Sequence, residues 1–401
     1  MPPRKRGRTV REAAAAPEDD GRDHISALPD YALEHILSFI PALDAARTCV
    51  LGRRWRHIWK STKGLRIVTP GSIQDIKEFV DHLLLIRAGS PVDTFELRTQ
   101  EGMSIEDNAR VNLWIRHALA CKACALQFEI FGSTTWLKLK DIHLLFASQY
   151  LSRLDFAYVQ FRDCFLNFSS CPALQDLQGV VAKRISSQSL KRLSIAGCNS
   201  IRTLRTCIHA PNLISLCLDE TFHRAPVLEK MPSLVEAVVT IRECNSDICT
   251  RTTSQGCNVL ECKGCYGIEG DTSCVLLQGL YTVKNMALVA LSNTFIFRRD
   301  LKHCPTFRHL KNLLLNEYWC VPDVCALACI LQHAPVLENL THQLFSKGPT
   351  HQVEINGNPN PKVISAAISQ QLKIVEVKCK HFICIRGLVL NFIIFGNSSL
   401  Q

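Results

Sequence analysis

The hydrophobic pattern becomes regular only after residue 24, where it predicts three short helices. Asp30 stands at the expected start of the first helix, as a candidate N-cap. Four apolar residues then recur at i, i+3, i+4 and i+7, the spacing of one helix face: Leu33, Ile36, Leu37 and Ile40. Two shorter amphipathic segments follow before residue 60. Three helices of this size bury little core, so we expect the unit to need a partner or a neighbouring domain.

After Gly64 the pattern changes to alternating helices and strands. Capping-box sequences at 72–75 and 104–107 predict two helix starts. Apolar residues that recur at every second position predict strands at 92–97 and 126–130. This strand–helix–strand order favours right-handed crossovers and parallel strand pairing.

A recurring Leu-x-x-Leu-x-Leu pattern dominates the rest of the chain. Clear copies begin at six positions: Leu151, Leu190, Leu213, Val283, Leu310 and Leu372. Weaker copies begin at Leu174 and Leu234. From Leu151 to Leu234, successive copies are 23, 16, 23 and 21 residues apart, mostly within the 20–29 residues of a leucine-rich repeat. The uneven spacing predicts an irregular solenoid with inserted loops.

The strand part of each repeat predicts which side chains point inward. Side chains alternate along a strand, so Leu193 and Ile195 should face the core, with Ser194 and Ala196 on the open face. One repeat cannot bury its apolar side, but stacked repeats bury a continuous core. The sequence therefore predicts a parallel-stranded stack with one exposed strand face.

Composition supports a folded chain and limits the function classes. The chain has 401 residues, 47% of them hydrophobic and 20% charged, which excludes disorder throughout. No apolar run is long enough to predict a membrane span, and the basic start lacks the apolar segment of a secretory signal. The 20 cysteines are therefore expected to be mainly reduced, with Cys171, Cys198 and Cys217 in structural positions.

The net charge of +10 is concentrated at the start of the chain. Residues 1–66 hold 13 Lys and Arg against 8 Asp and Glu, which is half of the total excess. The basic run 4–8 has two equally weighted interpretations, a nuclear-import patch or a solvated tail. The charge does not predict a nucleic-acid face over the whole surface.

The order of motifs in residues 24–64 resembles that of a plant F-box. The segment contains Leu28-Pro29, then Ile-Leu-Ser-Phe-Ile-Pro at 36–41 and Arg-Arg-Trp-Arg-His-Ile-Trp at 53–59. The resemblance implies docking to the Skp-type adaptor of a cullin ubiquitin ligase. The residues expected to take part are Leu28, Pro29, Leu33, Ile36, Leu37, Ile40, Pro41, Val50, Trp55 and Trp59. The alternative is that these residues only pack against the next domain.

The repeat region is similar to that of plant F-box proteins with leucine-rich repeats. Residues 372–379 resemble the start of the C-terminal FBD region of such proteins, and after Lys380 the chain departs from that pattern. We therefore expect an α/β fold, in which a small all-α F-box module precedes an irregular leucine-rich-repeat solenoid with parallel strands. The predicted division is a tail at 1–23, the F-box at 24–66, the repeats at 67–345, and a linker with a truncated FBD-like region at 346–401.

Known catalytic and metal motifs are weak or missing in the sequence. It contains no P-loop, no Gly-x-Ser-x-Gly and no His-Glu-x-x-His. Cys121 and Cys124 have metal-like spacing but no nearby second pair. Four cysteines in a polar insert form a weak zinc candidate: Cys257, Cys262, Cys265 and Cys274. We expect no cofactor and no catalytic residue.

These patterns favour an interaction protein over an enzyme. The F-box would bind the adaptor, and the exposed strand face would hold a target protein. Candidate target-binding residues are Lys191, Arg192, Ser194, Ser215, Cys217, Asp219, Lys311, Asn312 and Asn316. The rival hypotheses are a nuclear nucleic-acid-associated or scaffold protein using the basic N-terminus, and a zinc-dependent sensor using the cysteines of 257–274. We expect a nuclear or cytoplasmic location, with neither membrane nor nucleic acid as a partner.

Overall fold

The structure is a computed structural model of the chain. It describes residues 25, 27–87, 89–101, 104–130, 137–138, 147–157, 159–160, 165–180, 182–196, 205–220, 225–241, 276–290, 300–301, 303–316, 319, 325–344 and 371–379. The basic tail, Cys198, the cysteine-rich insert and the segment after Cys379 lie outside the described residues.

The N-terminal part is a small helical module. Its elements are α1 (Asp30–Leu37), α2 (Ala42–Arg47), the 3₁₀ helix η1 (Thr48–Leu51) and α3 (Trp55–Ile58). Five side chains form its own core: Leu33, Leu37, Ala45, Trp55 and Ile58. This core is distinct from that of the remaining chain, but Ala42 of α2 packs into the latter, which joins the small unit to its neighbour.

The predicted N-cap role of Asp30 is wrong. Pro29 holds the N-cap position, and Asp30 is the first residue of α1. Its carboxylate accepts a hydrogen bond from Arg54 Nε at 2.6 Å, while Arg54 also donates to the Leu28 carbonyl. A tertiary partner near α3 therefore replaces the local cap that the sequence indicated.

Two helix–strand units join this module to the repeats. Their elements are β1 (Gly64–Thr69), η2 (Ile73–Asp75), α4 (Lys77–Arg87), β2 (Thr94–Thr99), α5 (Ile105–Ala120) and β3 (Ala125–Ile130). The capping box at α5 is present, because Asp107 N donates to Ser104 Oγ and Ser104 N donates to the Asp107 carboxylate. β2 begins two residues later than the predicted strand.

All neighbouring strands of the main sheet are parallel, in the order β1-β2-β3-β5-β8-β10-β12-β14-β15-β16-β17-β18. Its later strands are β5 (Arg153–Ala157), β8 (Asp176–Gln178), β10 (Arg192–Ala196), β12 (Ser215–Glu220), β14 (Glu236–Ile241), β15 (Asn285–Ala290), β16 (Asn312–Asn316), β17 (Asn339–Leu344) and β18 (Ile374–Cys379). Order in the sheet follows order in the chain, which is the topology of a solenoid.

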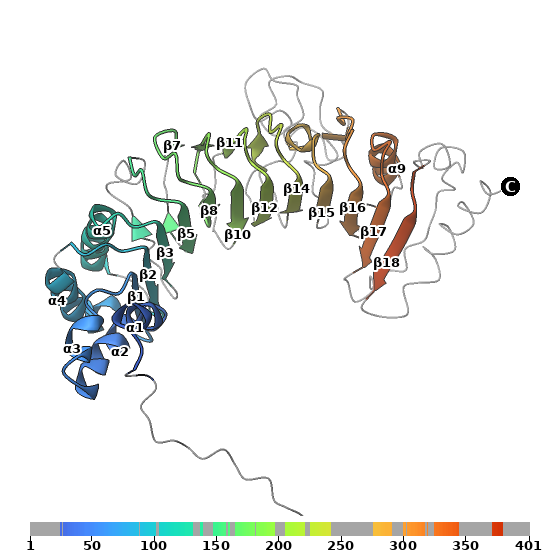
Figure 1. The fold of residues 1–401 in the computed structure, drawn as a ribbon. Coiled ribbons are helices and arrows are strands. Elements are labelled where there is room, and N and C mark those ends of the chain that lie inside the picture. The colour runs from blue at the N-terminus through green and yellow to red at the C-terminus, as the bar shows by residue number, and fades with distance from the viewer. Residues whose placement is uncertain are drawn as a thin grey trace, which may run out of the picture.

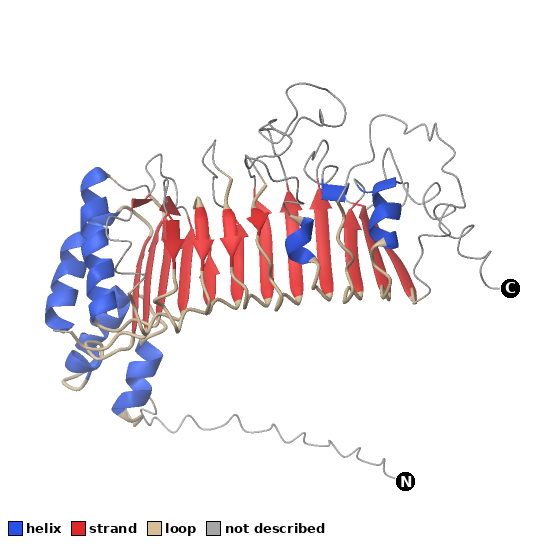
Figure 2. Ribbon diagram, turned by 90° about the horizontal axis from the view of Figure 1, so that it is seen from above, coloured by secondary structure: helices blue, strands red, loops and turns tan. Residues whose placement is uncertain are grey.

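Short elements cover the other side of the stack. A second sheet contains β7 (Phe165–Asn167), β9 (Arg184–Ser186), β11 (Cys207–His209) and β13 (Val227–Leu228). A two-stranded pair is formed by β4 (Leu137–Lys138) and β6 (Val159–Gln160), and the helices η3 (Leu277–Leu280) and α9 (Cys325–Gln332) follow. The main sheet lines the inner side of a curve, with these elements and α4 and α5 on its outer side (Figures 1 and 2).

The core runs along the stack as the repeat pattern predicts. Leu193 and Ile195 are buried, Ser194 is half-buried and Ala196 is exposed. Phe128 and Phe156 are register partners on β3 and β5 and stack with ring centroids 5.5 Å apart, and Phe95 on β2 makes a tilted ring contact with Phe128 at 5.9 Å. The expected fold class, a helical module followed by a parallel-stranded repeat solenoid, is confirmed. Among the described residues, no helix has the length and apolar character to cross a membrane.

Candidate functional site

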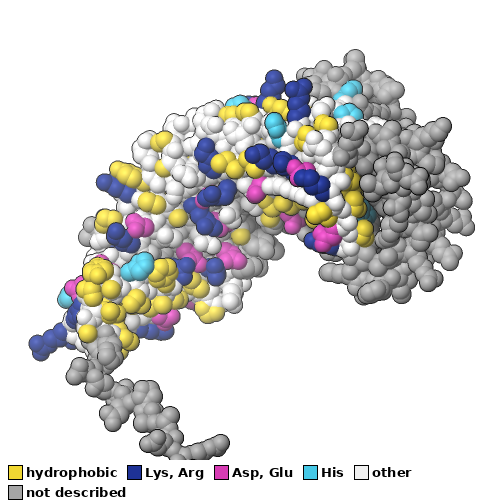
Figure 3. All heavy atoms as spheres, turned by 45° about the vertical axis from the view of Figure 1, so that its right-hand side comes forward, with side chains coloured by type: hydrophobic (Ala, Val, Ile, Leu, Met, Phe, Trp, Pro, Cys, Tyr) yellow, Lys and Arg dark blue, Asp and Glu magenta, His cyan; other side chains and the backbone are white. Residues whose placement is uncertain are grey.

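The helical module exposes many large apolar side chains. Its exposed side chains are Ile25, Tyr31, Ile36, Phe39, Leu43, Val50 and Leu51. Val50 is 84% exposed and Ile36 is 49% exposed, so these aliphatic side chains gain little from folding alone. Figure 3 shows hydrophobic side chains gathered over this end of the molecule. Apolar patches of this kind mark binding surfaces; we call these seven residues the helical docking surface.

The predicted adaptor-binding residues occupy three environments. Pro29, Ile36 and Val50 are exposed, and Leu28, Ile40, Pro41 and Trp59 are half-buried. Leu33, Leu37 and Trp55 are at most 8% exposed and belong to the module's core. For these three, the expectation of a direct surface contact is corrected: they support the surface from beneath.

Sequence reasoning missed several members of the docking surface, including Tyr31, Phe39 and Leu51. They lie off the apolar stripe that the helical spacing identified, so the pattern assigned them to no face. Their residue type could have indicated exposure, because large apolar side chains that lie outside the apolar stripe of a small helical unit have no core to pack into.

The helical module is held firmly against the first strand of the solenoid. Arg66 on β1 donates to the Phe39 carbonyl at 2.7 Å. Trp59 packs against both hydrophobic cores. Arg87, only 2% exposed, donates to the Thr62 carbonyl at 2.6 Å and thereby fixes the segment between α3 and β1. These contacts fix the direction in which the strand face points relative to the docking surface.

Gly64 lies at the closest approach between the two parts. A β-carbon at this position would lie 2.4 Å from the Ser38 carbonyl oxygen. We expect Gly64→Ala to lower the free energy of unfolding by about 1–3 kcal/mol, because backbone must move to relieve the overlap. Chemical denaturation of the purified chain measures this change. Gly52→Ala is the matched control, since its β-carbon would meet only Trp55 at 3.8 Å. Equal effects of both substitutions would contradict the assignment.

Ion pairs cross the first strands of the inner sheet face. Glu96 on β2, with its side chain 5% exposed, contacts Arg66 at 3.0 Å and Arg98 at 3.1 Å. Arg98 also contacts Glu129 on β3 at 2.7 Å. This chain of charges links three neighbouring strands and leaves none of these four groups without a partner. Further along, Arg192 on β10 makes a two-pronged contact with Asp176 on β8, at 2.5 and 2.7 Å.

The predicted target-binding residues lie along the same face, with one exception. Lys191, Ser194, Ser215, Cys217 and Asp219 are half-buried, whereas Arg192, Lys311 and Asn312 are exposed. Asn316 is 3% exposed, and its amide bonds both to the N–H and to the carbonyl of Ala290. Its predicted role in target binding is therefore wrong, because the side chain completes the end of β15 and faces no solvent.

A ladder of amides marks the C-terminal half of this face. Asn285, Asn312 and Asn339 occupy the same register position on β15, β16 and β17, and successive side chains are joined at 2.6 Å. Beside it, Lys311 and Lys373 both contact Glu338, at 2.7 and 2.9 Å. Hydrogen bonds from Lys311 and then Lys373 lower the pKa of Glu338 to about 2. This half of the face thus offers amides and ammonium groups, and the Glu338 carboxylate is already occupied by two lysines.

Some cysteines have a structural role, and others have spacing or surroundings that suit metal binding. Cys171 is fully buried, and burial raises its pKa, consistent with a structural role. Cys217 is half-buried on the strand face, and burial likewise raises its pKa. The weak zinc candidate formed by Cys257, Cys262, Cys265 and Cys274 lies outside the described residues.

The sequence spacing missed a different cluster, Cys304 with Cys329 and His333, whose members come from separate segments of the chain. A hydrogen bond from Cys304 lowers the pKa of Cys329 to about 6, and His333 acts in the same direction.

Comparison with known proteins bears on the helical module first. Residues 25–66 match the family model of the F-box domain. The chain carries an F-box. The apolar docking surface therefore belongs to a domain that implies binding of a Skp-type adaptor in an SCF ubiquitin ligase.

Relatives of this F-box chain extend the similarity into the repeats. The rice meiotic F-box protein MOF is 29% identical over 400 residues, covering 89% of this chain and 80% of that protein. An F-box/FBD/LRR-repeat protein of Arabidopsis thaliana is 23% identical, covering 87% of this chain and 82% of that protein. An Arabidopsis F-box/LRR-repeat protein is 27% identical, covering 89% and 81%. The resemblance to plant F-box proteins with leucine-rich repeats thus extends over most of the chain.

Proposed function

We propose that this chain is the substrate-recognition subunit of an SCF-type ubiquitin ligase. In this role the F-box binds the Skp-type adaptor, and the inner sheet face holds a target protein. The observation that carries the proposal is the firm attachment of an exposed apolar docking surface to a long open strand face. Arg66, Trp59 and Arg87 make that attachment.

Such a subunit accelerates ubiquitin transfer by holding the target close to the conjugating enzyme, without a reacting side chain of its own. Mixed charge along the inner face favours a protein target over nucleic acid, because a nucleic-acid surface requires a dominant positive stripe. Arg98 and Arg192, for example, are already paired with carboxylates on their own sheet. We place the complex in the nucleus, the cytoplasm or both.

The experiment is proximity labelling from the full chain in plant cells, with purification of the associated complex. We expect the adaptor, a cullin and a small set of target proteins, with the targets carrying ubiquitin. The comparison is the full chain with aspartates at Ile36 and Val50, which should retain the targets and lose the ligase. Recovery of neither adaptor nor cullin with the unmodified chain would overturn the proposal.

A further inference from the structure

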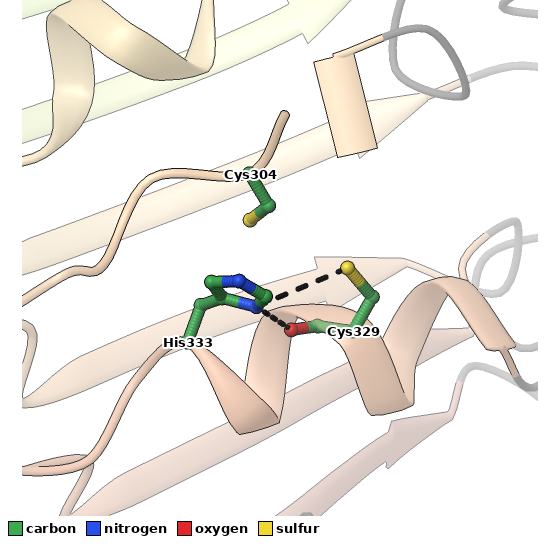
Figure 4. A group of neighbouring side chains, drawn as sticks. All are labelled: Cys304, Cys329 and His333. Atoms are coloured by element: carbon green, nitrogen blue, oxygen red, sulfur yellow. Dashed lines mark hydrogen bonds between the residues drawn. The ribbon is translucent and has the colours of Figure 1, made fainter. Parts of the chain in front are cut away.

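Three potential metal-ligating side chains converge on the outer side of the solenoid. Cys329 lies in α9, His333 follows the end of that helix, and Cys304 comes from the loop before β16 (Figure 4). One ligand atom from each residue lies within 4.8 Å of the other two, and all three side chains are half-buried. Half-burial keeps the cluster open to small ions while removing it from bulk water.

The local geometry explains why the three side chains meet. Cys329 and His333 are four residues apart, the spacing that brings side chains together on one face of a helical turn. His333 N donates to the Cys329 and Ile330 carbonyls, so the residue continues the last turn of α9. Phe307 N donates to the His333 carbonyl at 2.7 Å, which ties the Cys304 loop to the end of α9. The cluster is therefore held by backbone contacts on both sides.

A backbone contact selects the tautomer of the His333 imidazole. His333 Nδ1 lies 2.8 Å from the Cys329 carbonyl oxygen, which can only accept, so Nδ1 carries the proton in this bond. The lone pair is then on Nε2, and Figure 4 shows the second ring nitrogen on the side of Cys304. Metal-binding histidines commonly have this arrangement, with the other N–H donated to a backbone carbonyl.

The separations are close to those of a zinc site. Zinc–sulfur and zinc–nitrogen bonds of about 2.3 and 2.0 Å place tetrahedral ligands about 3.3–3.8 Å apart. The candidate ligand atoms of the three side chains all lie within 4.8 Å of one another. Shifts of the ligand atoms of about 1 Å would bring them to tetrahedral separations around an ion. Two sulfurs and one imidazole favour zinc over hard cations, which prefer oxygen ligands.

We propose that Cys304, Cys329 and His333 bind a zinc ion on the outer side of the solenoid. Three protein ligands leave a fourth coordination position for water or another group. The ion would join the Cys304 loop to α9 and so reinforce the connection between two successive repeats. This site is distinct from the four cysteines of 257–274, and it does not depend on the proposed role in ubiquitin transfer.

The test is cobalt binding, because cobalt in a tetrahedral thiolate site gives strong visible and near-ultraviolet absorption that zinc then abolishes. The full chain is purified with its adaptor, reduced, freed of metal with a chelator, and titrated with cobalt and then zinc. We expect saturable absorption from the unmodified chain. Cys304→Ser, Cys329→Ser and His333→Asn should each lose most of it. Cys207→Ser, at another half-buried cysteine, is the matched control.

A second comparison separates this site from the other cysteines. A chain with serine at 257, 262, 265 and 274 should keep the cobalt spectrum and the rise in melting temperature on adding zinc. Loss of both in that variant, with retention in Cys329→Ser, would overturn the proposal. The absence of cobalt absorption from the reduced unmodified chain would also overturn it. Adaptor binding shows only that the F-box of each variant is folded, because its core is separate from α9. Circular dichroism and the melting temperature of each metal-free variant show whether its solenoid is folded.

Discussion

Aspartate at both Ile36 and Val50 is expected to abolish capture of the Skp-type adaptor by the full chain. The two side chains are 49% and 84% exposed, so the charges face water in the free protein and leave its core intact. In the complex the same charges would be buried without partners, which is costly. Interface anchors of this kind contribute about 2–4 kcal/mol each, so affinity should fall at least about 100-fold. Titration of purified adaptor against the chain measures the loss.

A matched control distinguishes the docking surface from general effects of surface charge. Leu85 on α4 and Leu113 on α5 are 76% and 58% exposed but lie outside the F-box. Aspartate at both should leave adaptor affinity unchanged. Leu37→Asp is a poor probe, because Leu37 is 4% exposed and the substitution would disrupt the module's core. Unchanged adaptor binding by the Ile36 and Val50 double variant would show that this surface is not the docking site.

Phe128→Ala is expected to cause the largest loss of stability in the solenoid. Phe128 is 1% exposed, between Phe95 and Phe156 on the neighbouring strands. Removing a buried ring costs about 3–5 kcal/mol through lost burial and the cavity that remains. In a repeat stack the damage is greatest near the substitution, since each repeat contacts mainly its neighbours. Hydrogen exchange should therefore accelerate most in β2, β3 and β5.

Two controls make this result specific. Phe128→Leu preserves most of the apolar volume and should cost clearly less than the alanine variant. Adaptor affinity should change little in either variant, because the F-box has its own core. A cost below about 1 kcal/mol for Phe128→Ala would mean that the ring stack contributes little to the core.

The repeat architecture was predictable because its signal is repeated many times. Each Leu-x-x-Leu-x-Leu copy predicts a strand with the same inward-facing positions, so a copy with a weak pattern can be assigned from the stronger copies around it. Leu193, Leu216 and Leu313 are buried as expected and occupy equivalent register positions along the sheet. The F-box was also predictable, from a motif order that spans the whole module.

Individual side-chain roles were less predictable, because they depend on contacts between distant segments. Asn316 follows the inward Leu315 and so had an expected outward direction, yet its amide bonds to Ala290 of the preceding repeat. Leu37 and Ile36 belong to the same apolar stripe predicted for the first helix, but Leu37 is buried in the module's core whereas Ile36 is exposed. In the cluster of Cys304, Cys329 and His333, more than twenty residues of chain, including β16, separate Cys304 from the other two. Spacing motifs detect ligands only when neighbouring residues supply them.

In the proposed role as a substrate-recognition subunit, the close contact at Gly64 would also affect which lysines of a target are presented. β1 contacts the F-box and is also the first strand of the main sheet. The orientation of every later strand relative to a bound adaptor therefore depends on how β1 is attached. Each successive strand turns the inner face a little further around the curve (Figure 1). A target bound near β16 would therefore meet the conjugating enzyme at a different angle from one bound near β5. Under the proposed function, the strand at which a target binds would therefore determine which of its lysines receives ubiquitin.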